Sequence, residues 1–134
     1  MKSKRVYLPM SCDIFHVGHL KAIKWCSQFG KVTVGLLTDK AIEAYKKKPI
    51  IPFEHRKEIL ESIKEVHRVI PQHSLDMKLK GYDYVASGDG WEKKELKSIE
   101  KYGCEKLDIQ LKGEEEGQKL HSSTNIKNKI IGNI

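Results

Sequence analysis

The sequence predicts an α/β fold, in which a five-stranded parallel sheet carries helices on both faces within a single domain. Short apolar or β-branched segments alternate with segments of helical periodicity along the chain, and this alternation is typical of right-handed βαβ crossovers. The clearest strand, residues 31–37, is almost entirely apolar or β-branched, as expected when both faces of a sheet are covered. A chain of 134 residues is long enough for one hydrophobic core, so we expect residues 1–134 to form one domain.

The first three elements are a strand, a helix and a strand. Residues 4–8 are apolar at their centre and are followed by Pro9, which favours a first strand that ends there. Residues 17–29 carry apolar side chains at helical spacing, and Gly30 closes this helix. Residues 31–37 then form the second strand.

Two more helices follow, separated by a basic loop. Thr38 offers a side-chain cap for a helix over residues 39–45. The lysine run 46–48 is followed by two prolines, which break any helix, so it is expected to form a loop. Residues 53–65 are strongly amphipathic, with Ile59 expected on the apolar side.

The second half of the chain continues the alternation and makes the whole arrangement Rossmann-like. In such sheets the ligand lies beyond the carboxyl ends of the strands, and the chemically distinctive segments, 10–19, 38–48, 87–91 and 112–124, each follow a strand. The remaining elements are expected at 66–70 (a strand stopped by Pro71), 75–80 (a short helix ending at Gly81), 82–86 (a strand), 92–102 (a helix closed by Gly103), 106–111 (a strand) and about 123–131 (a helix).

Composition narrows the class of protein. The formal net charge of +7 fits a solvated basic surface, part of which neutralises a small polyanionic ligand. Nucleic-acid binding is disfavoured, because aromatic residues do not interleave with the basic ones. No apolar run has the length of a membrane span, and the first residues lack the apolar core of a signal peptide. Three cysteines without metal-binding spacing indicate free thiols. We therefore expect a cytoplasmic protein.

Residues 12–19, CDIFHVGH, lie where the first strand leads into the first helix. His16 and His19 are three apart and so share one helix face. Gly18 allows a ligand to approach the backbone, and the helix N-terminus suits an anion such as phosphate. Asp13, in the turn before the helix, fixes how the histidines enter this site.

This stretch resembles the GxFDxxHxGH signature of the nucleotidyltransferase superfamily, and in particular its cytidylyltransferase branch, with Cys12 in place of the family's aromatic residue. Three later segments agree. FEHRKEILE at 53–61 is similar to YEHRKxILE, SGDGWE at 87–92 to MGDDWE, and HSSTNI at 121–126 to ISTTxI. The resemblance covers most of the chain.

The resemblance also implies which residues catalyse. His16 and His19 would hold the triphosphate while its α-phosphorus is attacked. A lysine of the basic loop would reach both the α-phosphate and the attacking phosphate. Lys47 falls closest to that position, with Lys46 or Lys48 as alternatives.

Further residues would bind the nucleotide. Arg56 would orient the site or bind phosphate, and Asp89 would contact the base or order its loop. Trp91 would wall the base pocket, with ordinary core packing as an equal alternative. Gly90 replaces the family's second Asp and leaves the base contacts open. The full implied set is Cys12, Asp13, Gly18, Arg56, Gly88, Asp89, Trp91, Ser122, Ser123 and Thr124, the three hydroxyls holding the β- and γ-phosphates.

The implied reaction transfers CMP from CTP to a small phosphate- or phosphonate-bearing acceptor and releases pyrophosphate, with Mg²⁺ carried by the triphosphate and a homodimer as the expected assembly. The family's RTEG arginine is absent from residues 113–117, GEEEG, which leaves the acceptor open. The alternatives are an adenylyltransferase that uses ATP with a heptose-phosphate or FMN type of acceptor, and a non-catalytic nucleotide-binding module.

Overall fold

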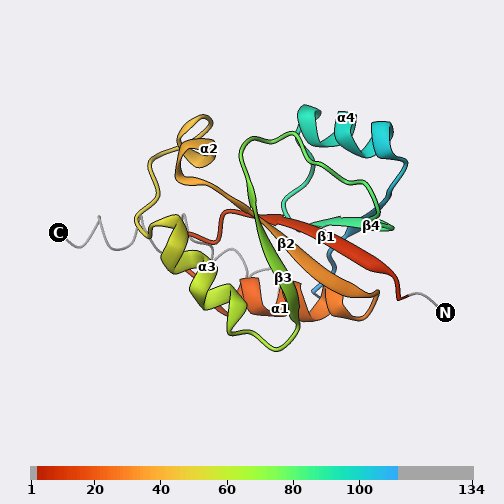
Figure 1. Cartoon of the computed structure of the whole chain (residues 1–134), viewed down its shortest axis with the longest axis horizontal. Helices are drawn as coiled ribbons and strands as arrows, with labels where there is room; N and C mark the ends of the chain where they lie inside the picture. Colours follow the sequence, from red (N-terminus) through yellow and green to blue (C-terminus); the bar gives the residue numbers. More distant parts are fainter. Residues whose placement is uncertain (1–2, 112–134) are drawn as a thin grey trace.

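A computed structural model describes residues 3–111 and confirms the predicted sheet. Five strands, all parallel, lie in the order β3-β2-β1-β4-β5 (Figure 1). The elements are β1 (Arg5–Met10), α1 (Val17–Ser27), β2 (Lys31–Leu37), α2 (Asp39–Glu43), α3 (Phe53–Glu61), β3 (Val66–Gln72), β4 (Tyr84–Ser87), α4 (Lys93–Tyr102) and β5 (Glu105–Asp108).

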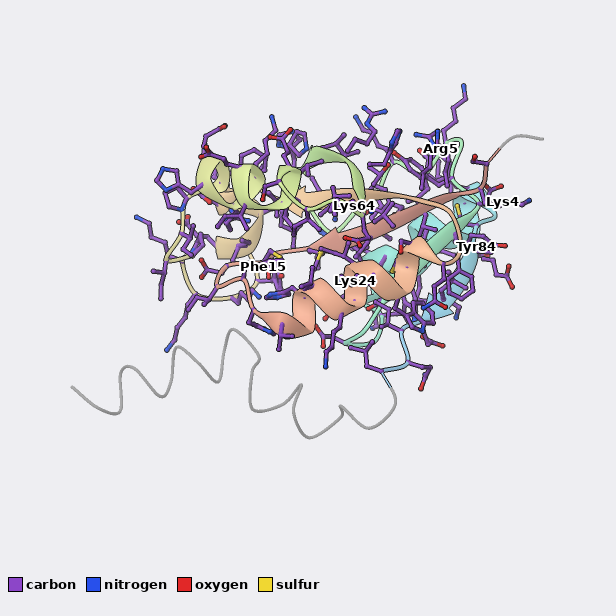
Figure 2. The ribbon with its side chains drawn as sticks, turned by 90° about the horizontal axis from the view of Figure 1, so that it is seen from below. Lys4, Arg5, Phe15, Lys24, Lys64 and Tyr84 are labelled. Atoms are coloured by element: carbon purple, nitrogen blue, oxygen red, sulfur yellow. The ribbon has the colours of Figure 1, made fainter. Side chains whose placement is uncertain are left out.

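Helices cover both faces of this sheet. Helices α1 and α3 lie side by side on one face and α4 lies on the other (Figures 1 and 2). Alternate residues of the central strand β1 supply the two cores: Val6 and Leu8 pack with Ile23 and Leu60 on the α1–α3 face, whereas Tyr7 belongs to the cluster on the α4 face. The inner strands are buried on both faces, which explains the continuous apolar run of β2.

Two prolines lie inside strands, where the sequence predicted strand ends. Pro71 is in β3, an edge strand, where a missing N–H can face away from the sheet. Pro9 is in the central strand β1 and is in register with Gly35 of β2. The pairing of β1 with β4 stops at Tyr7, so Pro9 interrupts no ladder on that side.

Two of the predicted helices are wrong in part or in whole. No helix forms over 75–80; this segment crosses the α4 face in extended form, with Met77 and Leu79 buried two residues apart and the Met77 N–H donating to Ser98 Oγ at 3.0 Å. Helix α3 ends four residues early, because the chain must turn to enter β3, and Ile59 is exposed. The predicted helix at 123–131 lies outside the described residues.

Within the described part of the chain, no helix combines the length and the apolar character that a membrane crossing requires.

Candidate active site

The two histidines cap the start of α1 with their own rings. His16 is the N-cap residue, in extended conformation, and its Nδ1 accepts the Gly18 N–H at 3.0 Å. The His19 Nδ1 accepts the backbone N–H of His16 at 3.2 Å. The ring centroids are 4.0 Å apart, and Phe15 stacks on His19 at 5.6 Å. The sequence therefore builds a capping box from imidazoles instead of the usual serine and glutamate.

This geometry fixes which nitrogen carries the proton. An Nδ1 that accepts a backbone N–H is unprotonated, so in the neutral ring the proton sits on Nε2. Both His16 and His19 thus present Nε2–H donors from one helix start. Burial, followed by the nearby His16 and Lys46, lowers the pKa of His19 from 6.5 to about 3. His19 consequently remains a neutral hydrogen-bond donor at physiological pH.

The lowered pKa predicts that acid destabilises the fold through His19. The unfolded side chain takes up a proton near pH 6.5 and the folded one only near pH 3, so the unfolded state binds more protons in this window and stability falls as pH falls. Between pH 7 and pH 5 we expect His19 to remove about 1–2 kcal/mol from the free energy of unfolding. Urea unfolding at both pH values should show a smaller loss for His19→Gln, which keeps an acceptor for the His16 N–H. Equal losses in the two proteins would contradict the prediction.

Cys12 and Asp13 shape the turn before the helix. Cys12 adopts a φ of +53°, unusual for a residue with a side chain, and burial raises the pKa of its thiol to about 12. Asp13 is 1% exposed, and its two carboxylate oxygens accept the N–H groups of Ile50 and Ile51 at 2.9 and 2.8 Å. Asp13 therefore fastens the end of the basic loop to the histidine turn.

The structure places Lys46 beside the histidines, whereas the sequence predicted Lys47 as the catalytic lysine with Lys46 or Lys48 as alternatives. Its Nζ lies 3.2 Å from Ser11 Oγ, and its charge contributes to the lowered pKa of His19. No hydrogen bond or ion pair joins the Lys47 side chain to another residue within 3–111. Sequence counting located the loop correctly but could not fix the register inside it.

Arg56 is a buried hub. It is 1% exposed and donates to the carbonyls of Ile51, Ser11 and Leu37 at 2.7–2.9 Å and to the Asp39 carboxylate at 2.6 Å. These contacts tie together the carboxyl ends of β1 and β2 and the end of the basic loop. With most of its N–H groups used in this way, Arg56 orients the site. Asp39 was missed by the sequence reasoning, although it lies in the segment 38–48 that follows the second strand, which was the available signal.

The loop after β4 carries the predicted base-binding residues. Asp89 is exposed, and the indole N–H of Trp91 donates to Asp108 at 2.9 Å while the ring packs on the edge of the α4-face core. A side chain at Gly88 would make only ordinary contacts with Ile109, so packing within the described residues does not demand a glycine there.

The basic loop and the loop after β4 approach each other. The pKa of Tyr45, next to Lys46, is raised by burial and then by the negative charges of Glu95, Glu92 and Asp89. The two loops thus lie on one side of the carboxyl edge of the sheet. The segments that follow β1 and β2 are joined by the contacts of Asp13 and Lys46, and charges of the segment after β4 act on Tyr45; that these segments form one binding site stays a prediction. Ser122, Ser123 and Thr124 lie outside the described residues.

Comparisons with known proteins agree with this arrangement. The family model described as cytidylyltransferase-like matches residues 11–129. The chain is 35% identical over 97 residues to the glycerol-3-phosphate cytidylyltransferase of Bacillus spizizenii, covering 68% of this chain and 75% of that protein. It is 29% identical over 135 residues to the FAD synthase of Archaeoglobus profundus, covering 95% and 86%.

A solved structure shares the fold. The lipopolysaccharide core biosynthesis protein from Thermoplasma volcanium superposes with a TM-score of 0.70 at 25% identity, over 81% of this chain and 98% of that one. The extent of the family match, the parallel sheet and the histidine pair lead to one conclusion. The chain belongs to the cytidylyltransferase-like family of nucleotidyltransferases.

Proposed function

We propose that this protein transfers CMP from CTP to a small acceptor that bears a phosphate or phosphonate, with release of pyrophosphate. The observation that carries the proposal is the pair of Nε2–H donors that His16 and His19 present at the start of α1, with Lys46 beside them. Two neutral donors and a cation at a helix N-terminus suit a polyphosphate.

The transfer would be an in-line displacement at phosphorus. An acceptor oxygen forms a bond to the α-phosphorus, the bond from that phosphorus to the bridging oxygen of the β-phosphate breaks, and pyrophosphate takes the electron pair. Catalysis then consists of positioning and of charge stabilisation. His16 and His19 would donate to the bridging and α-phosphate oxygens, and Lys46 would reduce the repulsion between the two anions.

The other predicted residues support this geometry. Asp13 and Arg56 hold the loops in place through the contacts described above, and Gly18 keeps the helix start open to the phosphates. We propose that Gly88, Asp89 and Trp91 face the base, and that Ser122, Ser123 and Thr124 contact the β- and γ-phosphates.

Mg²⁺ would arrive on the triphosphate and neutralise part of its charge. Mg²⁺ keeps several waters and takes few protein ligands. Within residues 3–111, no group of three or more His, Cys, Asp or Glu side chains is placed to hold a metal ion. Phosphate oxygens and water would supply most of the ligands of this Mg²⁺.

CTP is favoured over ATP by the SGDGWE segment and by the similarity to glycerol-3-phosphate cytidylyltransferase. The similarity to FAD synthase, which spans 95% of the chain, makes an ATP-dependent transfer to FMN the second candidate.

The proposal is tested by pyrophosphate release. CTP and ATP are each incubated with glycerol 3-phosphate, phosphoethanolamine, aminoethylphosphonate, a heptose phosphate and FMN in the presence of Mg²⁺. We expect release with CTP and at least one phosphate or phosphonate acceptor. Release with ATP and FMN alone would establish the second candidate, and nucleotide binding without release from any pair would indicate a non-catalytic module.

The choice between the lysines gives a separate prediction. Lys46→Ala should reduce kcat by about 100-fold, because it removes a charge that acts on the transferring phosphate, whereas Lys47→Ala should change kcat by less than about threefold, as expected for a solvated surface charge. The two variants carry the same change in net charge and lie on the same loop, so each controls for the other. The reverse order of effects would restore Lys47 as the catalytic lysine.

A further inference from the structure

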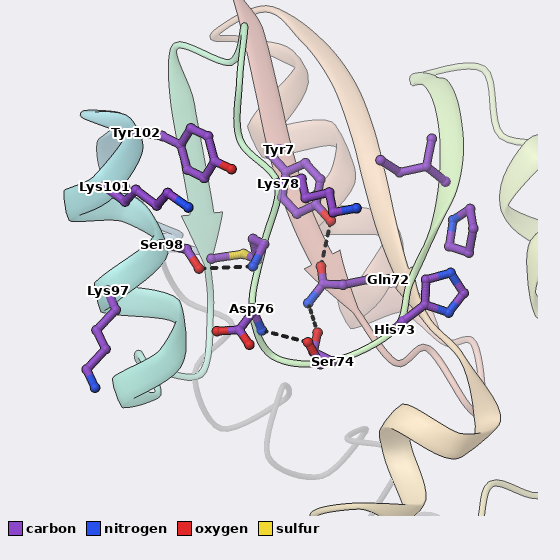
Figure 3. A pocket seen from close by; sticks show the side chains of 13 residues that line it. Tyr7, Gln72, His73, Ser74, Asp76, Lys78, Lys97, Ser98, Lys101 and Tyr102 are labelled. Carbon is purple, nitrogen blue, oxygen red and sulfur yellow. Dashed lines mark hydrogen bonds between the residues drawn. The ribbon is translucent and has the colours of Figure 1, made fainter.

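A pocket of about 570 Å³ opens on the α4 face of the sheet, between β3 and α4 (Figure 3). Its floor is fixed by hydrogen bonds: the Tyr7 hydroxyl donates to Gln72 Oε1 at 2.6 Å, and Gln72 Nε2 donates to the Ser74 carbonyl at 2.8 Å. A Cβ at Gly35 would overlap the Tyr7 hydroxyl, so the glycine on β2 is needed for this floor. The pocket is thus a built feature of the fold.

Three lysines lie on the rim of this pocket. Lys78 comes from the extended segment that follows β3, and Lys97 and Lys101 come from successive turns of α4 (Figure 3). Among the lining residues Asp76 is the one carboxylate. Such an excess of positive charge around a concave site favours an anionic ligand.

The pocket adjoins the candidate active site at the carboxyl end of the strands. The Thr38 N–H donates to the Gln72 carbonyl at 3.1 Å, which joins the end of β3 to the residue before Asp39, the partner of Arg56. Ser74 and Asp76 lie at the end of the pocket toward which the strands run, and Lys78 and Lys101 lie farther from that end (Figure 3). The end of the pocket at Gln72 and Ser74 therefore lies at the same edge of the sheet as the candidate active site.

The volume argues for an acceptor with a sizeable body. Pockets of about 300–1,000 Å³ accommodate ligands of many heavy atoms, which is more than a three-carbon phosphate needs. The groups assigned to the reacting phosphates, His16, His19 and Lys46, belong to other segments of the chain. The lysines of the pocket are then available for another group.

We propose that this pocket binds the body of the acceptor, and that the acceptor is of sugar-phosphate size and carries a second anionic group remote from the reacting phosphate. The inference rests on the proposed function, because it takes the reaction as given and names the class of its second substrate. Lys78 and Lys101 bind the remote anion, and the Gln72–Ser74 end of the pocket leads to the reacting centre.

Binding of three probes tests the proposal. Glycerol 3-phosphate, glucose 6-phosphate and 6-phosphogluconate are titrated calorimetrically into the protein with CMP present and Mg²⁺ omitted, so that no transfer occurs. The last two probes have equal numbers of carbons and differ in the carboxylate at the far end. We expect 6-phosphogluconate to bind at least about tenfold more tightly than either of the others.

Charge reversal locates the binding. Lys78→Glu combined with Lys101→Glu should weaken 6-phosphogluconate binding by about tenfold or more and leave CMP binding unchanged. The matched control, Lys93→Glu with Lys94→Glu, makes the same change in net charge at exposed positions of α4 that do not line the pocket, and should bind 6-phosphogluconate as the unaltered protein does.

Equal affinity for 6-phosphogluconate and glucose 6-phosphate, no binding of any probe, or equal behaviour of the two double variants would each overturn the proposal. A failure of the proposed function looks different. It appears in the separate pyrophosphate assay as an absence of release from every pair of substrates, or in a titration as an absence of nucleotide binding.

Discussion

Replacement of His16 by asparagine is expected to reduce turnover by about 100- to 1,000-fold while the fold stays intact. The imidazole does two things at once: Nδ1 accepts the Gly18 N–H and caps α1, and Nε2–H is the donor that we assign to the nucleotide phosphates. Asparagine is among the best N-cap residues and can take over the first role. It has no donor at the position of Nε2, so the second role is lost.

The alanine variant separates the two roles. His16→Ala removes the cap as well and should cost about 1 kcal/mol of stability in addition to the loss of turnover. Steady-state kinetics and thermal unfolding of both variants measure the two effects independently. His67→Asn, at an exposed position on β3, is the matched control and should alter neither. Turnover within threefold of normal in a folded His16→Asn protein would remove the histidine from the mechanism.

The dual use of the histidines also explains what the sequence could predict here. Spacing and the position after a strand were enough to place His16 and His19 together on one helix start, because both follow from periodicity and topology. The direction of each ring depends on two hydrogen bonds from backbone N–H groups to ring nitrogens, and residue spacing does not predict these bonds. The protonated nitrogen could therefore be assigned only from the structure.

The strands could be predicted from the sequence, whereas the path of the segment that follows β3 could not. Apolar runs predicted the inner strands β1, β2 and β4, because burial on both faces leaves a strong compositional signal. Residues 75–80 lacked such a signal. Their extended path is set by tertiary contacts, the Met77 N–H with Ser98 and the burial of Met77 and Leu79 against α4. The acceptor pocket that we propose is lined in part by this segment, and for the same reason it could not be predicted from the sequence.

The lysine loop shows a third kind of limit. Its basic run and its prolines indicated a loop after β2, and that is what forms. Which lysine lies beside the histidines depends on Asp13, whose carboxylate holds the N–H groups of Ile50 and Ile51, and on Ser11, which accepts from Lys46. Both are contacts between residues more than 30 positions apart, and local sequence does not encode them.

Arg56→Met is expected to lower the free energy of unfolding by about 3–5 kcal/mol, the largest loss of stability that we predict for one substitution. Methionine approximates the length of the side chain and fills the space. It leaves the buried carbonyl of Leu37 and the partly buried carbonyls of Ser11 and Ile51 without the donor that satisfies them now, and an unsatisfied buried acceptor costs its full desolvation penalty. Asp39 is 42% exposed, so water can replace its lost partner and it adds less.

Lysine in the same place distinguishes charge from geometry. Arg56→Lys keeps the positive charge, but one ammonium group cannot reach three carbonyls and a carboxylate that the planar guanidinium reaches together, so most of the loss should remain. Arg68→Met, at an exposed position on β3, should cost less than about 0.5 kcal/mol. Denaturant unfolding of the three variants decides the matter. A loss below 1 kcal/mol for Arg56→Met would show that the ends of β1 and β2 and the basic loop hold their places without the hub. Full stability in Arg56→Lys would show that charge alone holds them.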